Sequence, residues 1–503
     1  MRSGSKFIIN GILASLVGIA LRTVTLIFGA YISRVVGAEG VGLNTLVMSV
    51  YSFALTFATS GVGLTVTRLV AAHIGEGREC DIGRIMRGAT LYALAFSFTA
   101  TAVLSFSSGL LATAFLGDRR AVFSLQILSL SLIPSALSGV IGGYFIARRM
   151  VARGAVVQIL SQLFRILATV AMLAGAVRGS VEDAVGALSV GLTLTEFVTL
   201  GMYLILYIIE RVRYASWRKG TDIKPVARTA LPLAASAYIR AGLLSLEHAI
   251  IPRRLEKRGE SLSSALSSFG SLHGAALPVV TYPMTPLSSF AGLLLPEFAE
   301  SEASGNVDRL ERIAKRAISL TLAYAIIAAV TLFSFSEELG YAVYGTYASG
   351  YFISILAPVI PVMYIDHVVD SMLKGIGEQV YSMWVNIADS ALSVILVWLL
   401  IPLLGIEGYA IVIIIMEVFN LTLSYMRLGK RIRLRINAVE ALIIPLIAAL
   451  CAAFIADFLF VSAASLVSWL LVLKIVFSVS LYIALYIPLV AVYRIILNAR
   501  AGQ

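Results

Sequence analysis

The sequence predicts an all-α polytopic membrane protein with about 14 transmembrane helices, and three observations lead to this fold class. The 503 residues are 59% hydrophobic and only 13% charged, whereas soluble domains carry about 25% charged residues. The mean hydropathy is +0.92. Apolar runs of about 20 residues, the length that crosses the hydrocarbon core, recur from end to end. Little of the chain is left for a separate soluble domain.

Each transmembrane helix is expected where an apolar run reaches that length. The predicted spans are 7–33, 42–72, 86–116, 122–147, 151–177, 184–209, 229–251, 267–295, 312–335, 351–373, 380–403, 406–428, 438–460 and 466–495. Most connections between them are short, and the longest polar ones are 210–228, 252–264 and 296–311.

Basic residues are divided unequally between the two sets of connections. If the N-terminus is cytosolic, the connections on the cytosolic side hold 26 of the 39 Lys and Arg, and the outer connections hold 8. The positive-inside rule then predicts a multi-pass protein of the plasma membrane with both termini in the cytoplasm. This distribution explains the net charge of +11 without nucleic acid as a partner. Cys80 and Cys451 provide neither a disulfide framework nor a metal-binding spacing.

An internal repeat predicts that the helices form two similar lobes. Residues 71–89 (AAHIGEGRECDIGRIMRGA) align without a gap on residues 299–317, which pairs Gly77 with Gly305. An even number of helices per repeat gives both copies the same orientation, hence a parallel repeat. The predicted divisions are an N-terminal lobe of helices 1–6 (1–210), a C-terminal lobe of helices 7–12 (211–428) and two additional helices, 13 and 14 (429–503).

Two stretches near the N-terminus, and an echo in the second half, carry a family resemblance. They are SRVVGAEGVGLNTLVMSVYSF (33–53), TSGVGLTVTRLVAAHIGEG (59–77) and LLLPEFAESEASGNVDRL (293–310). They resemble the stage V sporulation protein B and polysaccharide-biosynthesis branch of the multidrug/oligosaccharidyl-lipid/polysaccharide exporter superfamily, a relative of the lipid II flippase. The resemblance implies a V-shaped, two-lobe transporter that moves polyprenyl-pyrophosphate-linked sugars by alternating access. It leaves the sugar open, and it suggests sporulation, vegetative cell-wall (peptidoglycan) or capsule synthesis as the setting.

Arginines inside the predicted spans are the candidate substrate-binding residues, because a charge in the bilayer must face protein or water. Arg22, Arg165 and Arg240 lie near mid-bilayer, and Arg68 lies toward the cytosolic end of the second span. Guanidinium groups suit a pyrophosphate because they remain protonated and bind phosphate oxygens in pairs. The resemblance implies a cationic central cavity, and the positions of Arg22, Arg68 and Arg240 fit it. Arg165 is assigned to the cavity only because it lies near the middle of its span. The structural alternative is pairing with a buried carboxylate such as Glu196.

Acidic and amide side chains inside the spans gather in the second half. The candidate cation-coupling residues are Asp366 and Asp370 of the tenth span, Asn386 and Asp389 of the eleventh, and Glu417 of the twelfth. Carboxylates combined with carbonyl groups are what a Na⁺ or H⁺ site requires. We therefore expect no cofactor and no metal beyond a Na⁺ site, with transport coupled to a Na⁺ or H⁺ gradient or to the membrane potential. The alternative is that these acids neutralise Arg240 and polar neighbours.

The leading functional prediction is a monomeric flippase for a lipid-linked oligosaccharide, with membrane lipids and cell-wall synthesis enzymes as further partners. No Gly-rich phosphate loop with Lys and Ser/Thr is present, so the sequence predicts no ATP hydrolysis and no enzyme. One alternative is a cation-coupled multidrug exporter of the same fold. It is disfavoured because the first lobe carries Arg22, Arg68 and Arg165 against one in-span acid, Glu196. The other alternative is a non-transporting membrane scaffold for cell-wall or spore-cortex synthesis.

Overall fold

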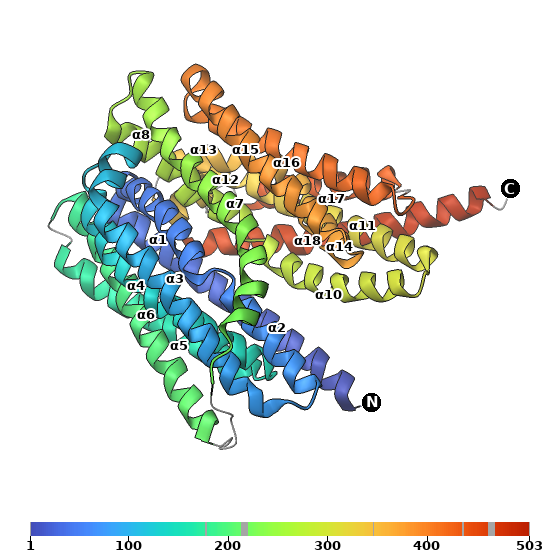
Figure 1. Cartoon of the computed structure of the whole chain (residues 1–503). Helices are drawn as coiled ribbons and strands as arrows, with labels where there is room; N and C mark the ends of the chain where they lie inside the picture. Colours follow the sequence, from blue (N-terminus) through green and yellow to red (C-terminus); the bar gives the residue numbers. More distant parts are fainter. Residues whose placement is uncertain are drawn as a thin grey trace. The chain divides into compact units, whose positions relative to one another are not determined.

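The computed structural model describes residues 2–176, 179–212, 220–345, 347–434, 437–460 and 468–501, and every regular element within these ranges is helical (Figure 1). The all-α prediction is therefore confirmed. The chain divides into two compact units. The first comprises Met1–Val24 and Val35–Gly270, and the second comprises Thr25–Arg34 and Ser271–Gln503. The predicted lobe boundaries remain a prediction, and residues 213–219 of the long basic connection lie outside the described residues.

The first unit is built mainly from eight helices. They are α1 (Arg2–Thr59, of which Thr25–Arg34 groups with the second unit), α2 (Val62–Gly75), α3 (Ile82–Leu110), α4 (Ala121–Ala147), α5 (Val151–Ala176), α6 (Val181–Val212), α7 (Ile223–Lys257) and α8 (Leu262–Phe269). Helix α4 packs against α2, α3 and α6 and forms the centre of this unit.

Helix α1 consists of two helices joined at Gly37, where the backbone is not helical and φ is 79°. A straight helix of 58 residues would be about 87 Å long at about 1.5 Å per residue. That length is nearly three times the hydrocarbon thickness of about 30 Å. The break at Gly37 therefore separates two spans and falls in the predicted outer connection, residues 34–41.

Small residues allow α2 and α4 to approach at backbone distance. A Cβ added at Gly143 would lie 2.4 Å from the carbonyl oxygen of Gly63. Thr67 uses this approach to donate a hydrogen bond to the Gly143 carbonyl at 3.1 Å. Membrane helices associate through such close packing because lipid supplies no hydrophobic force between them.

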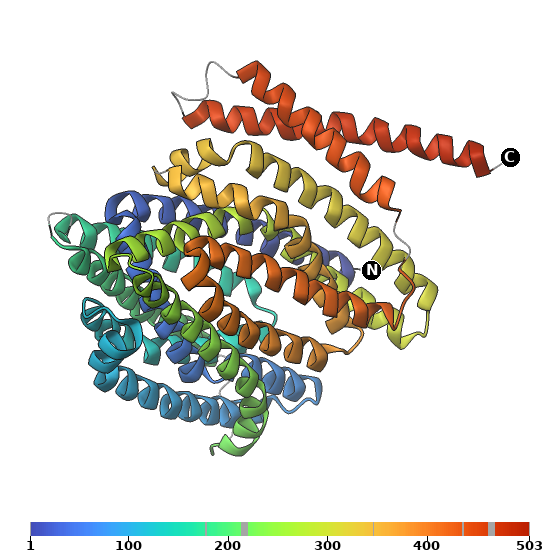
Figure 2. The ribbon, with the colours of Figure 1, turned by 90° about the horizontal axis from the view of Figure 1, so that it is seen from above.

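The second unit is centred on α14, which packs against α10, α11 and α16. Its helices are α9 (Leu277–Thr281), α10 (Met284–Ala303), α11 (Val307–Ser334), α12 (Ser336–Tyr344), α13 (Tyr347–Leu356), α14 (Ile360–Gly375), α15 (Gln379–Leu404), α16 (Ile406–Gly429), α17 (Ile444–Phe460) and α18 (Ser468–Ala501). Helices α17 and α18 pack on each other and both contact α11, as Figure 2 shows for the red pair beside the yellow helix.

A buried lysine connects α18 to its neighbours. Lys474 is 2% exposed and forms ion pairs with Asp457 of α17 at 2.7 Å and Glu338 of α12 at 3.2 Å. Its ammonium also lies 4.7 Å from the centre of the Phe335 ring. Ion pairs as well as apolar packing thus hold the C-terminal helix pair against the other helices of the second unit.

The repeat found in the sequence recurs in the geometry of helix ends. Gly77 after α2 and Gly305 after α10 both have positive φ, 70° and 66°. The same hydrogen bond closes each turn, from the Arg78 amide to the carbonyl of residue 73 at 2.8 Å, and from the Asn306 amide to that of residue 301 at 3.1 Å. Two further pairs of turns at the same offset of 228 residues have positive φ, namely Gly117 with Gly345 and Arg149 with Gly377.

By length and apolar composition, 11 helices of the described residues could cross a membrane, or up to 12 if the bent pair within α7 is one span. One reason for the lower number is that the stretch Ala20–Gly75 counts once, although the break at Gly37 separates spans 7–33 and 42–72 within it. The predicted span 267–295 is interrupted by the π-helical segment Gly270–Ala276 and by a turn before α10. A total of 14 spans remains a prediction.

Candidate functional site

The four arginines predicted to bind substrate all belong to the first unit. Arg22 lies on α1, Arg68 on α2, Arg165 on α5 and Arg240 on α7. The side chains of Arg22, Arg68 and Arg240 are exposed, whereas that of Arg165 is partly buried. An exposed guanidinium on a membrane-crossing helix must reach water or head groups, because hydrocarbon penalises it by about 2.5–3.5 kcal/mol or more. The arginines are grouped by unit, and their convergence on one cavity remains a prediction.

Arg165 lines a polar cavity of about 300 Å³ between α1, α5 and α6. Gln158 and Gln162 line the same cavity and, with Arg165, form the polar wall that α5 contributes. Leu21 of α1 is also part of the wall, which places the backbone of the adjacent Arg22 at the border of this cavity.

A carboxylate shares the cavity with Arg165. Glu196 of α6 accepts a hydrogen bond from the Ser135 hydroxyl at 2.7 Å, and its charge attracts Arg165. The Tyr51 hydroxyl interacts with both charges. Arg165 therefore has the acidic neighbour that the structural alternative requires.

An apolar pocket of about 590 Å³ lies between α1, α3 and α7. Its walls include Phe53 and Phe57 of α1 and Leu246 of α7. Gly242, which also lines the pocket, is two residues from Arg240. The volume lies within the range of small-molecule pockets, about 300–1,000 Å³. The first unit thus combines exposed arginines with an apolar recess.

Sequence reasoning missed a break in the middle of the second predicted span, at Ser60 and Gly61. Both residues have positive φ, 43° and 67°. The buried Ser60 hydroxyl bonds to the Tyr92 hydroxyl of α3 at 2.6 Å and accepts a hydrogen bond from Tyr238 of α7. Glycine after the last helical residue is a common helix stop, so the TSG triplet at 59–61 was an available signal.

The five predicted cation-coupling residues all belong to the second unit. Asp366 and Asp370 lie on α14, Asn386 and Asp389 on α15, and Glu417 on α16. The charge of Asp366 repels that of Asp370 and of Asp389, and Glu417 is repelled by Asp366 and Asp389. The four carboxyls therefore form one electrostatic cluster across three helices.

A polar chain extends from this cluster along α15. Asp370 accepts hydrogen bonds from Lys374 and Ser382, and the Asn386 amide donates to the Ser382 carbonyl at 2.7 Å. The buried Oδ1 of Asp366 has no hydrogen-bond partner among the described residues. No group of three or more His, Cys, Asp or Glu within the described ranges could hold a metal ion. A Na⁺ ion here would therefore need amide, hydroxyl or backbone oxygens as additional ligands.

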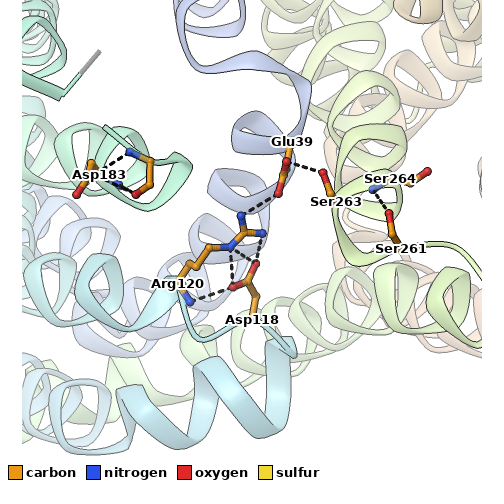
Figure 3. Close-up of polar contacts among 8 residues, drawn as sticks. Glu39, Asp118, Arg120, Asp183, Ser261, Ser263 and Ser264 are labelled. Carbon is orange, nitrogen blue, oxygen red and sulfur yellow. Dashed lines mark hydrogen bonds and ion pairs between the residues drawn. The ribbon is translucent and has the colours of Figure 1, made fainter. Parts of the chain in front are cut away.

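An ion-pair cluster on the predicted outer side joins three segments of the first unit (Figure 3). Arg120 contacts Asp118 through two nitrogens, Nε to Oδ1 at 3.1 Å and Nη2 to Oδ2 at 2.8 Å. Its third nitrogen donates to Glu39 at 2.8 Å, and Ser263 of α8 donates to the other oxygen of Glu39 at 2.5 Å. The hydrogen bonds that Arg120 donates to Asp118 raise the pKa of Arg120. The hydrogen bonds that Glu39 accepts from Ser263 and then from Arg120 lower the pKa of Glu39.

Glycines bring α8 against α1 beside this cluster. A Cβ at Gly42 would lie 2.0 Å from the Leu266 carbonyl oxygen, and a Cβ at Gly270 would lie 2.3 Å from the Ala38 carbonyl oxygen. Only glycine fits a backbone approach this close. Gly42 therefore serves a helix crossing, a role that the sequence alone does not separate from that of a turn glycine.

Comparisons with known proteins agree with this architecture. Residues 8–248 match the polysaccharide biosynthesis protein family, and residues 273–399 match the MatE family. Stage V sporulation protein B of Bacillus subtilis is 23% identical over 407 residues, which cover 79% of this chain and 78% of the relative. Lipid II flippase MurJ of Bacillus subtilis is 23% identical over 351 residues, covering 61% of this chain and 62% of the relative.

Solved structures share the fold at lower identity. The lipid II flippase MurJ in an inward closed conformation superposes with a TM-score of 0.68 at 12% identity, covering 95% of this chain and 97% of that one. An inward-facing multidrug resistance MATE transporter gives 0.66 at 15% identity, with 83% and 98% covered. A Pyrococcus furiosus transporter, described by a binding pocket of reverse polarity, gives 0.64 at 16% identity, with 84% and 95% covered.

These matches confirm the resemblance found in the sequence. Both halves of the chain carry family models, and the relatives and fold neighbours are membrane transporters and proteins of polysaccharide biosynthesis and sporulation. The chain is a multi-pass membrane transporter related to the lipid II flippase and to MATE transporters, and its first half is similar to polysaccharide biosynthesis proteins.

Proposed function

We propose that this transporter is a flippase that moves a polyprenyl-pyrophosphate-linked oligosaccharide or cell-wall precursor across the plasma membrane by alternating access. The observation that carries the proposal is the separation of charge. The candidate arginines lie in the first unit and the candidate acids in the second. A pyrophosphate must pass about 30 Å of hydrocarbon, and guanidinium groups bind its oxygens without losing their own charge. The apolar recess between α1, α3 and α7 suits the lipid portion of such a substrate.

Arg22 offers the sharpest test in the first unit, because its side chain is exposed and its backbone borders the polar cavity. Arg22→Ala is expected to slow flipping about 10- to 100-fold, which corresponds to losing a charge-assisted hydrogen bond of about 1.5–3 kcal/mol. Arg22→Lys keeps the charge and should retain part of the rate. Lys257→Ala, at the exposed end of α7, is the matched control and should not change the rate.

The assay reconstitutes the full chain into vesicles that contain fluorescent lipid-linked sugars of defined structure. A reagent that quenches only the outer leaflet reports the rate of translocation. The flippase proposal fails if no lipid-linked sugar crosses faster with the protein than in protein-free vesicles. A rate unchanged by Arg22→Ala would separate Arg22 from the substrate path.

We also propose that the acidic cluster of the second unit holds the coupling cation, either Na⁺ or H⁺. Asp389 lies on α15 and is repelled by Glu417 and Asp366, so a bound cation would relieve both repulsions. Asp389→Asn is expected to make flipping insensitive to imposed Na⁺ and pH gradients. Transport by Asp389→Asn that still depends fully on the gradient would remove Asp389 from this role.

A cation-coupled drug exporter is the second candidate, favoured by the aromatic wall of Phe53 and Phe57 and by Glu196 in the same unit. It predicts that the reconstituted chain accumulates an organic cation dye and that Glu196→Gln abolishes this accumulation. The flippase proposal predicts that no dye is transported. It also predicts that only lipid pyrophosphates compete with the fluorescent lipid-linked sugar for translocation.

A further inference from the structure

A second groove of the first unit is lined by none of the candidate site residues. It has a volume of about 440 Å³ and lies between α3 and α6, with α4 as its floor. Arg87 of α3 and Arg211 of α6 line one end of the groove. Both charges act on the hydroxyl of Tyr207, which is part of the same wall. The two guanidinium groups and this hydroxyl therefore form one polar end.

The polar end is held in place by its surroundings. The Nε of Arg87 donates a hydrogen bond to the Gly220 carbonyl at 2.7 Å. The segment that contains Gly220 is itself tied to α3, because Asp222 forms an ion pair with Arg84 at 3.0 Å. The ring of Tyr207 packs edge-on against the ring of Tyr144, with 5.4 Å between centroids. Arg87 and Tyr207 are thus held by their neighbours, and Arg211 completes the basic end of the groove.

The rest of the groove is apolar and open. Leu91 and Leu204 line it and are 52% and 40% exposed. Leu91 lies one turn beyond Arg87 on α3, and Leu204 lies two turns before Arg211 on α6, which is about 6 Å and 10 Å along the helices. Both helices therefore run from a charge near the predicted cytosolic surface to leucine nearer the membrane centre, as a phospholipid does.

We propose that this groove binds an anionic glycerophospholipid of the inner leaflet, with its phosphate at Arg87 and Arg211 and one acyl chain along Leu91 and Leu204. Basic pockets between membrane helices on the cytosolic side bind anionic head groups, and anionic lipids are concentrated in that leaflet. An arginine pair matches a phosphate in charge and geometry. The lipid would be a resident ligand rather than cargo, so the site is separate from the proposed substrate path.

The test titrates the purified full-length chain in detergent with palmitoyl-oleoyl phosphatidylglycerol and, separately, with phosphatidylcholine, and counts bound lipid by native mass spectrometry. Wild-type protein should bind phosphatidylglycerol more tightly. Arg87→Gln/Arg211→Gln should weaken that binding about 25-fold, about fivefold for each basic residue, and leave phosphatidylcholine binding unchanged. Leu91→Trp keeps both charges and fills the apolar end of the groove. It should weaken the binding of both phosphatidylglycerol and phosphatidylcholine.

Lys315→Gln/Arg316→Gln is the matched control, because these exposed residues of α11 lie on the same predicted side but outside the groove. The proposal is overturned if wild-type protein shows no preference for phosphatidylglycerol. It is equally overturned if the double arginine variant binds phosphatidylglycerol as tightly as the control variant does. It is also overturned if inorganic phosphate alone displaces the lipid. Displacement by equimolar undecaprenyl pyrophosphate would instead assign the groove to substrate entry. Thermal melting of every variant establishes that it is folded.

Discussion

The buried lysine of α18 allows an asymmetric test of what holds the C-terminal helix pair in place. Lys474 is 2% exposed, whereas its partners Glu338 and Asp457 are 32% and 58% exposed. Removing both acids leaves an ammonium that water cannot reach. Removing the lysine leaves two carboxylates near helix ends, with Asp457 three residues before the end of α17 and Glu338 in the first turn of α12, where water or head groups reach them. The two perturbations break the same ion pairs and should not cost the same.

The expected magnitudes follow from that difference in exposure. Glu338→Gln/Asp457→Asn should lower the free energy of unfolding by about 3–5 kcal/mol, the cost of a buried charge without its partners. Lys474→Met loses two partly exposed ion pairs, worth about 0–1 kcal/mol each, and a contact with the Phe335 ring of about 0.5–2 kcal/mol. It also removes the desolvation of the ammonium, which offsets much of this loss. We expect a net cost below about 2 kcal/mol.

The assay is thermal unfolding of the full chain in detergent, followed by intrinsic tryptophan fluorescence. Glu337→Gln, at the exposed neighbour of Glu338, controls for charge lost from the start of α12. A Lys474→Met variant that melts as low as the double acid variant would refute the reasoning from exposure. A double acid variant with the melting temperature of wild type would show that the ion pairs of Lys474 do not stabilise the protein.

Three further predictions use the same melting assay. Arg149 has a φ of 60°, a conformation that costs a non-glycine residue about 1–2 kcal/mol, so Arg149→Gly should raise the melting temperature. Gly42→Ala should lower the free energy of unfolding by about 1–3 kcal/mol through overpacking, whereas Gly139→Ala, with nothing within 4 Å of the added Cβ, should not lower it. The hydrogen bond from Ser263 lowers the pKa of Glu39 from its ordinary 4.5, so the stabilisation is complete above that pH and is lost as the pH falls through the lowered pKa. Wild type should therefore lose more stability than Glu39→Gln between pH 6 and pH 3.

The positions of most helices could be predicted from the sequence, because a membrane-crossing helix needs an apolar run of about 20 residues. The break at Ser60 and Gly61 and the interruptions within 267–295 could not, because apolar length does not report them. The repeat was recognisable at Gly77 and Gly305, because the two aligned segments have identical residues before and after the turn. The equivalent turns at Arg149 and Gly377 were not recognisable, because they share a backbone conformation and not a residue type. The two halves thus share backbone conformation at more positions than they share amino-acid identity.

Candidate site residues could be assigned to helices, but their partners could not. The attraction between Arg165 and Glu196 joins residues on two helices, and the ion pair of Lys474 with Glu338 joins residues 136 positions apart. Helical periodicity predicts which face a residue occupies on its own helix and carries no information about which helix packs there. The groove of Arg87 and Arg211 was missed for this reason.

The repeat also explains how one backbone frame can carry two kinds of chemistry. The ends of α4 and α14 coincide at an offset of 228 residues, and α5 and α15 coincide at both ends. In this register, charged residues of one unit correspond to small uncharged residues of the other: Arg165 with Ser393, Asp366 with Ser138, Asp370 with Gly142, and Asp389 with Ser161. Asn386 corresponds to Gln158, so an amide is kept in both. Two units with the same charges would compete for the same ligand. The candidate arginines lie in one frame and the candidate coupling acids in the other, while Glu196 remains beside Arg165 in the first. The proposed anionic head group and the proposed coupling cation would then each be favoured by a different unit, which is the arrangement that coupled exchange between two ligands requires.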